Sequence, residues 1–336
     1  GNVVGDNRNE VAFTHFFTSQ NPNQETTVFV LDAATGTQLF RWNVPGFTWS
    51  AVALADLDGN GLRELVLETY HSASSAGRVY AKRANGTDLP GWPQIANNTQ
   101  GFSEIAPVVG DVNGDCRYEI LVGNTLYRSN GTPMPGWPTN LIGRSTGALG
   151  NLDADGALEV AMGGGNMITS WFVENNATLN MGLSQSFENL YVLGFNENYK
   201  QGHPLLADVN GDGRIDLVRQ SELGTVDPNR AMPIYAFDLQ NGQKLPQSRR
   251  VRSTEPGGAY SFPLYSTGAI GDVNGDGRRD LVLVAKNQVW AWRLDAPDLA
   301  GKAPWPMYQR DLLNSGTLPL GAGCATTAPV PWTPSF

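Results

Sequence analysis

A ten-residue stretch decides the fold: Asp-Val-Asn-Gly-Asp-Gly-Arg-Ile-Asp-Leu at 208–217, which returns at 272–281 as Asp-Val-Asn-Gly-Asp-Gly-Arg-Arg-Asp-Leu. Four more copies carry the same pattern with more changes, beginning at Asn2, Asp56, Asp111 and Asn151. Successive copies start 54, 55, 40, 57 and 64 residues apart. A period of roughly 50 residues is typical of arrays in which each repeat is one supersecondary unit.

Each repeat predicts four short β-strands. A small apolar run such as 106–109 precedes the motif, and a second strand such as 119–122 follows it directly. A third strand such as 78–81 is joined by an Asn-Gly turn signal, here Asn85-Gly86, to a fourth that carries a Trp-Pro element. Four-stranded units at this period stack radially around an axis. We therefore expect an all-β β-propeller of four-stranded blades, six by motif count, or seven if further sequence precedes the chain.

The repeats set the boundaries of the predicted propeller at residues 1–316, with 317–336 as a C-terminal tail. The first repeat lacks its first strand, because the chain begins inside that repeat. The tail from Thr317 to Leu320 is the candidate to supply this strand and close the ring.

The composition excludes several classes of protein. The net charge is −9 and charged residues make up 16% of the chain, so the clustered positive charge that binds nucleic acid is missing. No apolar run reaches the roughly 18–20 residues of a membrane-spanning helix. The 39 Gly and 21 Pro disfavour a helical protein, while 40% hydrophobic residues suffice for a core.

The acidic motif has the chemistry of a cation site. Oxygen-bearing side chains occupy positions 1, 3, 5 and 9, the carbonyl of position 7 adds a further oxygen, and glycines at positions 4 and 6 permit a tight turn. Ca²⁺ takes roughly six to eight oxygens in a flexible geometry, and three carboxylates per loop suit it better than Mg²⁺. The predicted metal ligands of the five well-formed loops are Asp56, Asp58, Asn60, Leu62, Glu64, Asp111, Asn113, Asp115, Arg117, Glu119, Asn151, Asp153, Asp155, Ala157, Glu159, Asp208, Asn210, Asp212, Arg214, Asp216, Asp272, Asn274, Asp276, Arg278 and Asp280.

A helix-loop-helix calcium site is the competing interpretation, because its loop opens with the same spacing. Such a loop needs an acid at position 12. That position holds residues that cannot ligate Ca²⁺: Leu67, Val122, Met162, Arg219 and Leu283. The acid falls instead at position 9 and leads into a strand, which excludes this type of site.

The spacing Asp-x-Asn-Gly-Asp-Gly-x-x-Asp-Leu between two strands resembles the calcium loop of FG-GAP/VCBS repeats, which build the integrin α-subunit propeller and many secreted bacterial propellers. The resemblance covers residues 1 to about 315. It implies about five Ca²⁺ ions with a mainly structural role, and a secreted or cell-surface location. The first copy keeps only Asn2, Asp6 and Glu10, so we expect it to bind weakly or not at all.

Cys116 and Cys324 are the two cysteines of the chain. Cys116 replaces the second glycine of its loop, where it either strains the turn or positions a thiol for pairing. A Cys116–Cys324 disulfide would pin the tail across the face that carries the calcium loops, and it would fit an oxidising compartment. Two free thiols are an equally simple interpretation.

Strand order separates two faces of the ring. The calcium loops and Asn-Gly turns fall at one end of the blades, and long segments such as 163–189 and 245–262, expected to be irregular loops, fall at the other. Long loops are often functional, and aromatic and Arg side chains are enriched at binding surfaces. The ligand-face candidates are Tyr70, His71, Trp171, Phe172, Arg249, Arg250, Arg252 and Tyr260. Alternatively, the aromatic residues pack the loops together and the arginines are solvated.

The sequence contains no nucleophile-elbow, zinc-protease or P-loop motif, and no catalytic residue is assigned. It favours a secreted or surface-exposed, calcium-stabilised module that binds or adheres to a protein or glycan. The alternatives are a non-catalytic domain of a larger extracellular enzyme, an enzyme such as a propeller lyase or hydrolase, and a structural subunit of an extracellular assembly.

Overall fold

The computed structural model is built from β-strands, and no helix occurs in the residues that it describes. The described residues are 1–6, 8–16, 25–48, 50–71, 76–96, 105–137, 146–152, 158–164, 167–174, 177–180, 185–186, 203–220, 231–239, 244–252, 267–285, 288–307, 310–311, 315–321 and 324.

The strands form six antiparallel sheets in the described part of the chain. The first three sheets contain β1 (Glu10–Phe16), β2 (Glu25–Asp32) and β3 (Gln38–Pro45), then β4 (Ala53–Ala55), β5 (Glu64–His71), β6 (Ala76–Lys82) and β7 (Gln94–Ala96), then β8 (Val108–Gly110), β9 (Glu119–Val122) and β10 (Thr125–Arg128). The last three contain β11 (Ala148–Gly150), β12 (Glu159–Gly164), β13 (Met167–Glu174), β14 (Ala177–Asn180) and β15 (Gln185–Ser186), then β16 (Leu205–Ala207), β17 (Asp216–Gln220), β18 (Ala231–Asp238) and β19 (Arg249–Arg252), then β20 (Ala269–Gly271), β21 (Arg278–Ala285) and β22 (Gln288–Pro297).

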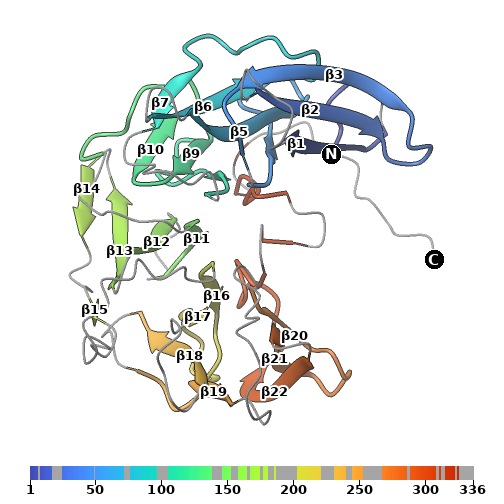
Figure 1. The fold of residues 1–336 in the computed structure, drawn as a ribbon. Coiled ribbons are helices and arrows are strands. Elements are labelled where there is room, and N and C mark those ends of the chain that lie inside the picture. The colour runs from blue at the N-terminus through green and yellow to red at the C-terminus, as the bar shows by residue number, and fades with distance from the viewer. Residues whose placement is uncertain are drawn as a thin grey trace.

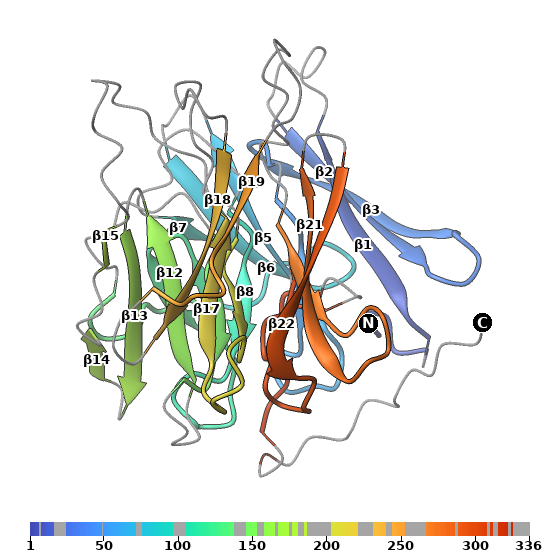
Figure 2. The ribbon, with the colours of Figure 1, turned by 90° about the horizontal axis from the view of Figure 1, so that it is seen from below.

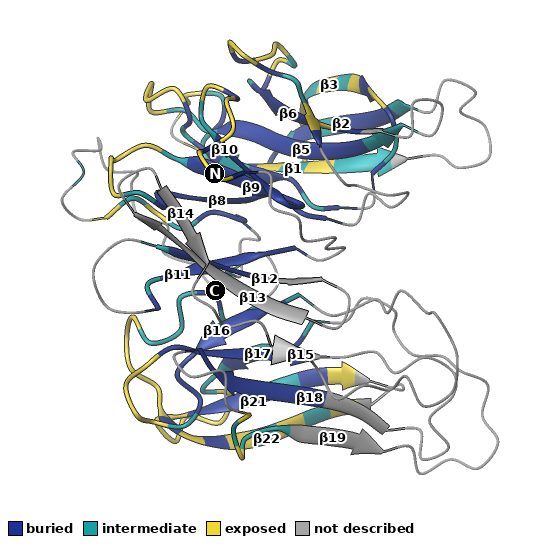
Figure 3. Cartoon of the chain, turned by 90° about the vertical axis from the view of Figure 1, so that its left-hand side faces the viewer, coloured by how far each residue is buried: buried dark blue, intermediate teal, exposed yellow. Residues whose placement is uncertain are grey.

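The sheets follow one another in chain order around a central axis (Figure 1). Figure 2 shows their strands rising side by side. Sheets of antiparallel strands repeated radially in this way define the β-propeller fold, which confirms the predicted fold class. Figure 3 shows buried strands inside the molecule and exposed loops gathered at one end of the sheets.

The acidic motif forms the hairpin loop between the first two strands of a sheet. In the second sheet Ala55 pairs with Glu64, the acid at position 9, and Leu54 pairs with Leu65. The same register places the last residue of β8, β11, β16 and β20 opposite the position 9 acid. The predicted order of a short apolar strand, the motif and a second strand is therefore confirmed in these five sheets.

Apolar side chains fill the space between neighbouring sheets. Alternation along β5 sends Leu65 toward Val28 and Val30 of the first sheet, and sends Val66 toward Ile120 of the third. Both faces of a middle sheet are therefore buried. Two further clusters join the third to fifth sheets and the fifth to the sixth. The Trp-Pro tryptophans belong to this core, at 7%, 6% and 1% exposure for Trp92, Trp137 and Trp305.

Among the described residues of the C-terminal tail, 317–321 and 324, none pairs with β1. Thr317 forms a parallel bridge with Val109 of β8. The corresponding end of β1 is already occupied, because Gly1 and Glu10 exchange two backbone hydrogen bonds of 2.9 and 3.2 Å. The expected pairing is therefore replaced by one with the third sheet, where the edge of β8 offers free N–H and C=O groups.

Among the described residues, no helix is long and apolar enough to cross a membrane.

Candidate functional site

The acid at position 9 closes each acidic loop, the predicted calcium loop, onto itself. Its carboxylate accepts a hydrogen bond from the backbone N–H of position 2, at 2.9 Å between Leu57 N and Glu64 Oε2. The same bond joins Val3 to Glu10, Val112 to Glu119, Leu152 to Glu159, Val209 to Asp216 and Val273 to Asp280. This bond uses one oxygen of the carboxylate.

The Asp at position 1 holds the tight turn. Asp208 Oδ1 accepts from Gly211 N at 2.7 Å, and Asp208 Oδ2 accepts from Gly213 N at 3.0 Å. The two glycines have φ values of +84° and +87°, the left-handed region that glycine adopts at little cost. The equivalent bonds form around Asp111 and Asp272.

The other predicted side-chain ligands are held by the backbone of the same turn. Position 5 accepts a hydrogen bond from the N–H of position 7, in the pairs Asn60 with Leu62, Asp115 with Arg117, Asp212 with Arg214 and Asp276 with Arg278. Position 3 accepts from the N–H of position 5 at Asn113, Asn210 and Asn274. In the fourth loop Asp153, Asp155 and Ala157 lie outside the described residues, and Asn151 and Glu159 flank them.

Carboxylate oxygens converge inside the loops. One oxygen from each of Asp56, Asp58 and Glu64 lies within 4.8 Å of the others. In two other repeats an oxygen of the position 9 acid, Glu10 Oε1 or Asp216 Oδ1, is buried and accepts no hydrogen bond within the described structure. A buried carboxylate oxygen without a donor is costly, and a divalent cation would supply the missing positive charge. The residues present therefore fit Ca²⁺.

The electrostatics of the loops also match a cation site. Burial, reinforced by the two acids that precede it in the loop, raises the pKa of Glu119 to about 8. Burial and neighbouring acids likewise raise the pKa of Glu64 to about 7 and that of Asp216 to about 7. At position 1 of the sixth loop the opposite holds, because the N–H of Gly277 and its neighbours lower the pKa of Asp272. Glu64, Glu119 and Asp216 are thus the acids that a bound cation would have to deprotonate.

This pattern predicts how pH affects the calcium-free protein. The pKa of Glu119 and of Asp216 is higher in the folded than in the unfolded chain, so unfolding releases protons between their ordinary pKa and about 8. Their stabilising contribution is complete below pH of about 4 and is lost as the pH rises through 7 to 8. We expect protein stripped on a chelating resin to have a Tm several degrees lower at pH 8.5 than at pH 6.

With saturating calcium this difference should disappear or reverse, because the ion replaces the protons. Differential scanning calorimetry at the two pH values, with and without calcium, measures both effects. A calcium-free Tm that is constant or higher at pH 8.5 would contradict the interpretation.

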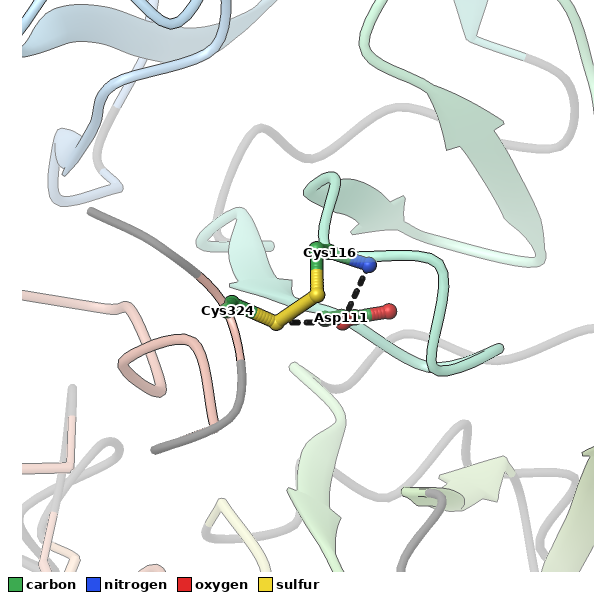
Figure 4. Close-up of side chains that lie close together, drawn as sticks. All are labelled: Asp111, Cys116 and Cys324. Atoms are coloured by element: carbon green, nitrogen blue, oxygen red, sulfur yellow. Dashed lines mark hydrogen bonds between the residues drawn. A yellow bond between two sulfur atoms is a disulfide. The ribbon is translucent and has the colours of Figure 1, made fainter.

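A disulfide joins Cys116 to Cys324, 208 positions apart in the sequence, with a Cα–Cα distance of 5.3 Å (Figure 4). Cys116 adopts a φ of +63°, in the left-handed region that Gly61, Gly213 and Gly277 occupy at the same position of their loops. Its N–H donates to Asp111 Oδ2 at 2.9 Å, and Cys324 Sγ lies 3.9 Å from the same oxygen. The two sulfurs are bonded to each other, so Asp111 is the member of this group that can ligate a metal.

Several cationic side chains around the loops were not among the sequence candidates. Arg83 Nη2 lies 2.8 Å from Asp58 Oδ2, and Arg293 Nη2 lies 3.4 Å from Asp276 Oδ2. The fully buried guanidinium of Arg279 donates to the carbonyls of Asp208 and Leu299, both at 2.8 Å. The sequence offered one signal for Arg279: it occupies position 8 of the sixth copy, where the nearly identical fifth copy has Ile215.

The ligand-face candidates do not share one set of loops. Trp171 and Phe172 lie within β13, and Trp171 pairs with Val160, next to the position 9 acid Glu159. They therefore lie at the calcium end of their sheet, opposite to the expected end. The prediction failed because 163–189 contains three strands and not one irregular loop.

The remaining candidates lie at the end away from the calcium loops. Tyr70 and His71 end β5, and the Tyr70 ring packs edge-on against Phe47 at 5.4 Å between ring centroids. The three arginines belong to the edge strand β19, not to a loop: Arg249, Arg250 and Arg252. They pair with the first half of β18, far from Asp216, and Tyr260 lies outside the described residues.

Each loop continues into a strand, as predicted. The position 12 residues lie in β5, β9, β12, β17 and β21, so the helix-loop-helix interpretation is excluded for these loops. His203 is a packing residue: burial, then the nearby Arg219, lowers its pKa to about 3. Its imidazole is therefore neutral at physiological pH.

Comparison with known proteins supports the fold. No family model and no curated protein sequence matches the chain. The crystal structure of the V. cholerae biofilm matrix protein Bap1 is similar with a TM-score of 0.51 and 16% identity, over 88% of this chain and 51% of that chain. The chain thus spans about half the length of that structure. At this identity the likeness concerns the fold alone.

Two further solved structures align less well. Rhamnogalacturonan lyase YesW gives a TM-score of 0.49 at 15% identity, over 95% of this chain and 66% of that chain. The Dos1 propeller gives 0.46 at 12% identity, over 82% and 63%.

Proposed function

We propose that the chain is a secreted or surface-exposed β-propeller of the FG-GAP/VCBS type, in which about five Ca²⁺ ions stabilise a module that binds or adheres to a protein or glycan. The observation that carries the proposal is the repeated loop, in which the N–H of position 2 holds the carboxylate of position 9. In the second copy, oxygens of Asp56, Asp58 and Glu64 lie within 4.8 Å of one another. Millimolar calcium outside cells suits loops of moderate affinity.

Two observations support an extracellular setting. The chain carries a disulfide, and such bonds persist in oxidising compartments. The protein of similar fold, Bap1, is a biofilm matrix protein.

Five divalent ions would bring the net charge from −9 to +1, so the acidic residues of the chain serve mainly as loop ligands and do not form a surface for basic partners.

The ligand is expected at the sheet ends opposite the calcium loops. This end carries Tyr70 and His71 on β5 and the arginine-rich edge strand β19. Arg and aromatic side chains dominate recognition surfaces, and aromatic rings also stack on sugars. Trp171 and Phe172 are no longer part of this candidate surface, because they lie at the calcium end.

A glycan and protein array tests the function with calcium and with chelator. We expect binding in calcium and its loss in chelator, together with a marked loss for Arg250→Glu. Arg41→Glu, a charge reversal at an exposed position of β3 outside the acidic loops and outside the candidate surface, is the matched control and should bind normally. Weakening by Arg41→Glu alone would overturn the placement of the ligand. Absence of binding to every class would overturn the function, and conversion of an arrayed polysaccharide to shorter products would replace it by an enzymatic one.

A further inference from the structure

The first strands of the sheets have an edge that faces the axis of the ring. Such an edge carries N–H and C=O groups that no strand of its own sheet can satisfy. A single segment meets this edge in several sheets. We call it the axial strap, defined as residues 302–307, 310–311, 315–321 and 324, and Figure 1 shows it crossing the centre of the ring in red.

Carbonyl groups of the axial strap accept hydrogen bonds from the middle residue of four inner strands. The bonds are Leu54 N to Ser315 O at 3.1 Å, Val109 N to Gly316 O at 2.8 Å, Leu206 N to Trp305 O at 2.8 Å and Ile270 N to Pro306 O at 2.8 Å. These residues belong to β4, β8, β16 and β20. One segment therefore bonds to the second, third, fifth and sixth sheets.

Bonds in the return direction complete the pairing. Leu318 N donates to Val109 O at 2.7 Å, Thr317 Oγ1 donates to Leu54 O at 3.0 Å, and Trp305 N donates to Leu206 O at 3.3 Å. The fourth sheet is reached by packing. A Cβ added to Gly150 of β11 would lie 3.0 Å from Pro304 Cγ, so the strap approaches this strand as closely as glycine allows.

The two halves of the axial strap are anchored differently. The first half is held by Trp305, which is 1% exposed in the core cluster of the third to fifth sheets. The second half, from Ser315 onward, has smaller side chains and ends at Cys324, whose sulfur is bonded to Cys116 beside β9. The covalent bond thus holds the half with the weaker apolar anchor.

We propose that the axial strap is a lock that holds the ring of sheets together, and that the Cys116–Cys324 disulfide makes this lock sensitive to reduction. A dithiol such as dithiothreitol passes two electrons and two protons to the disulfide, which becomes two thiols while the reductant becomes a cyclic disulfide. The second half of the strap then opens from β4 and β8 far more often, since the cross-link no longer limits its excursions.

Trypsin reports this opening at a defined bond. Arg310 lies between the two halves, and its guanidinium donates to the Thr317 carbonyl at 3.1 Å. No Lys or Arg follows it, so cleavage after Arg310 yields the single peptide 311–336. We expect this peptide to form about tenfold faster after reduction, with the sample reduced before mass spectrometry in all arms.

The control variant is Cys116→Gly/Cys324→Ser, which restores the glycine of the other loops and removes the cross-link. It should be cleaved as fast as the reduced protein, without reductant. Equal rates for oxidised and reduced protein, or a variant as resistant as the oxidised protein, would overturn the proposal. All arms are run with saturating calcium and without it. We expect the same ratio of the cleavage rate of the reduced protein to that of the oxidised protein with and without calcium, so the result does not depend on calcium binding.

Discussion

Removal of calcium is expected to lower the Tm of this protein by about 10 °C. At millimolar calcium, a loop with a Kd of about 10⁻⁴ M contributes roughly 1.4 kcal/mol, and five loops together contribute about 7 kcal/mol. The calcium-free fold is less stable because like charges lie close together and a carboxyl group is buried. Oxygens of Asp56, Asp58 and Glu64 lie within 4.8 Å of one another, and Glu119 is buried. Calorimetry in calcium and in chelator measures the difference.

A single-loop variant checks that the effect belongs to these loops. Glu64→Gln should reduce the calcium stoichiometry in isothermal titration by one ion and remove part of the calcium-dependent rise in Tm. Asp88→Asn is the matched control, because Asp88 belongs to none of the acidic loops. Its Oδ1 lies 2.6 Å from Lys82 Nζ. A Tm that is the same with and without calcium would show that the loops do not stabilise the fold.

Replacing Trp305 by Ala should destabilise the protein by about 3–5 kcal/mol. The indole is 1% exposed and lies in the cluster that joins the third, fourth and fifth sheets. Truncation leaves a cavity between the sheets. Because the backbone of each sheet is held by its own hydrogen bonds, the sheets cannot move together to fill this cavity. Urea unfolding followed by tryptophan fluorescence and circular dichroism gives the change in free energy.

The same measurement on Leu299→Ala provides the control. Leu299 lies six residues earlier in the chain and is 54% exposed, so its truncation should cost less than about 0.5 kcal/mol. If the two variants were equally stable, Trp305 would not be a core anchor, and the first half of the axial strap would be held by backbone hydrogen bonds alone.

The acidic loops were predictable because their internal geometry is local. The backbone-to-carboxylate and backbone-to-amide hydrogen bonds within a loop join residues that are at most seven positions apart, as between Val209 and Asp216. Oxygen at alternate positions and glycine at the turns are enough to specify such a loop. The same locality made the inner strands predictable, since each is the short apolar run before a motif.

The ligand-face residues show the limit of prediction from local sequence patterns. Trp171 and Phe172 were placed by assuming that a long interval without a motif is a loop. The chain instead forms β13 there, and its pairing with β12 carries them to the calcium end. Only the cross-strand register decides the end of a sheet at which a residue lies, and a shift of register cannot be seen in composition.

The repeats by themselves determined the β-propeller fold, the hairpin that carries each acidic loop and the oxygen ligands within it, because these depend on contacts over a few residues. The tertiary structure alone decided where the C-terminal segment goes. The inner edges of β4, β8, β16 and β20 each present an N–H that bonds to the axial strap and not to a strand of its own sheet, and these groups are brought together only when the sheets surround an axis. A strap that bonds to residues up to about 260 positions away follows from that closure, and not from any local preference.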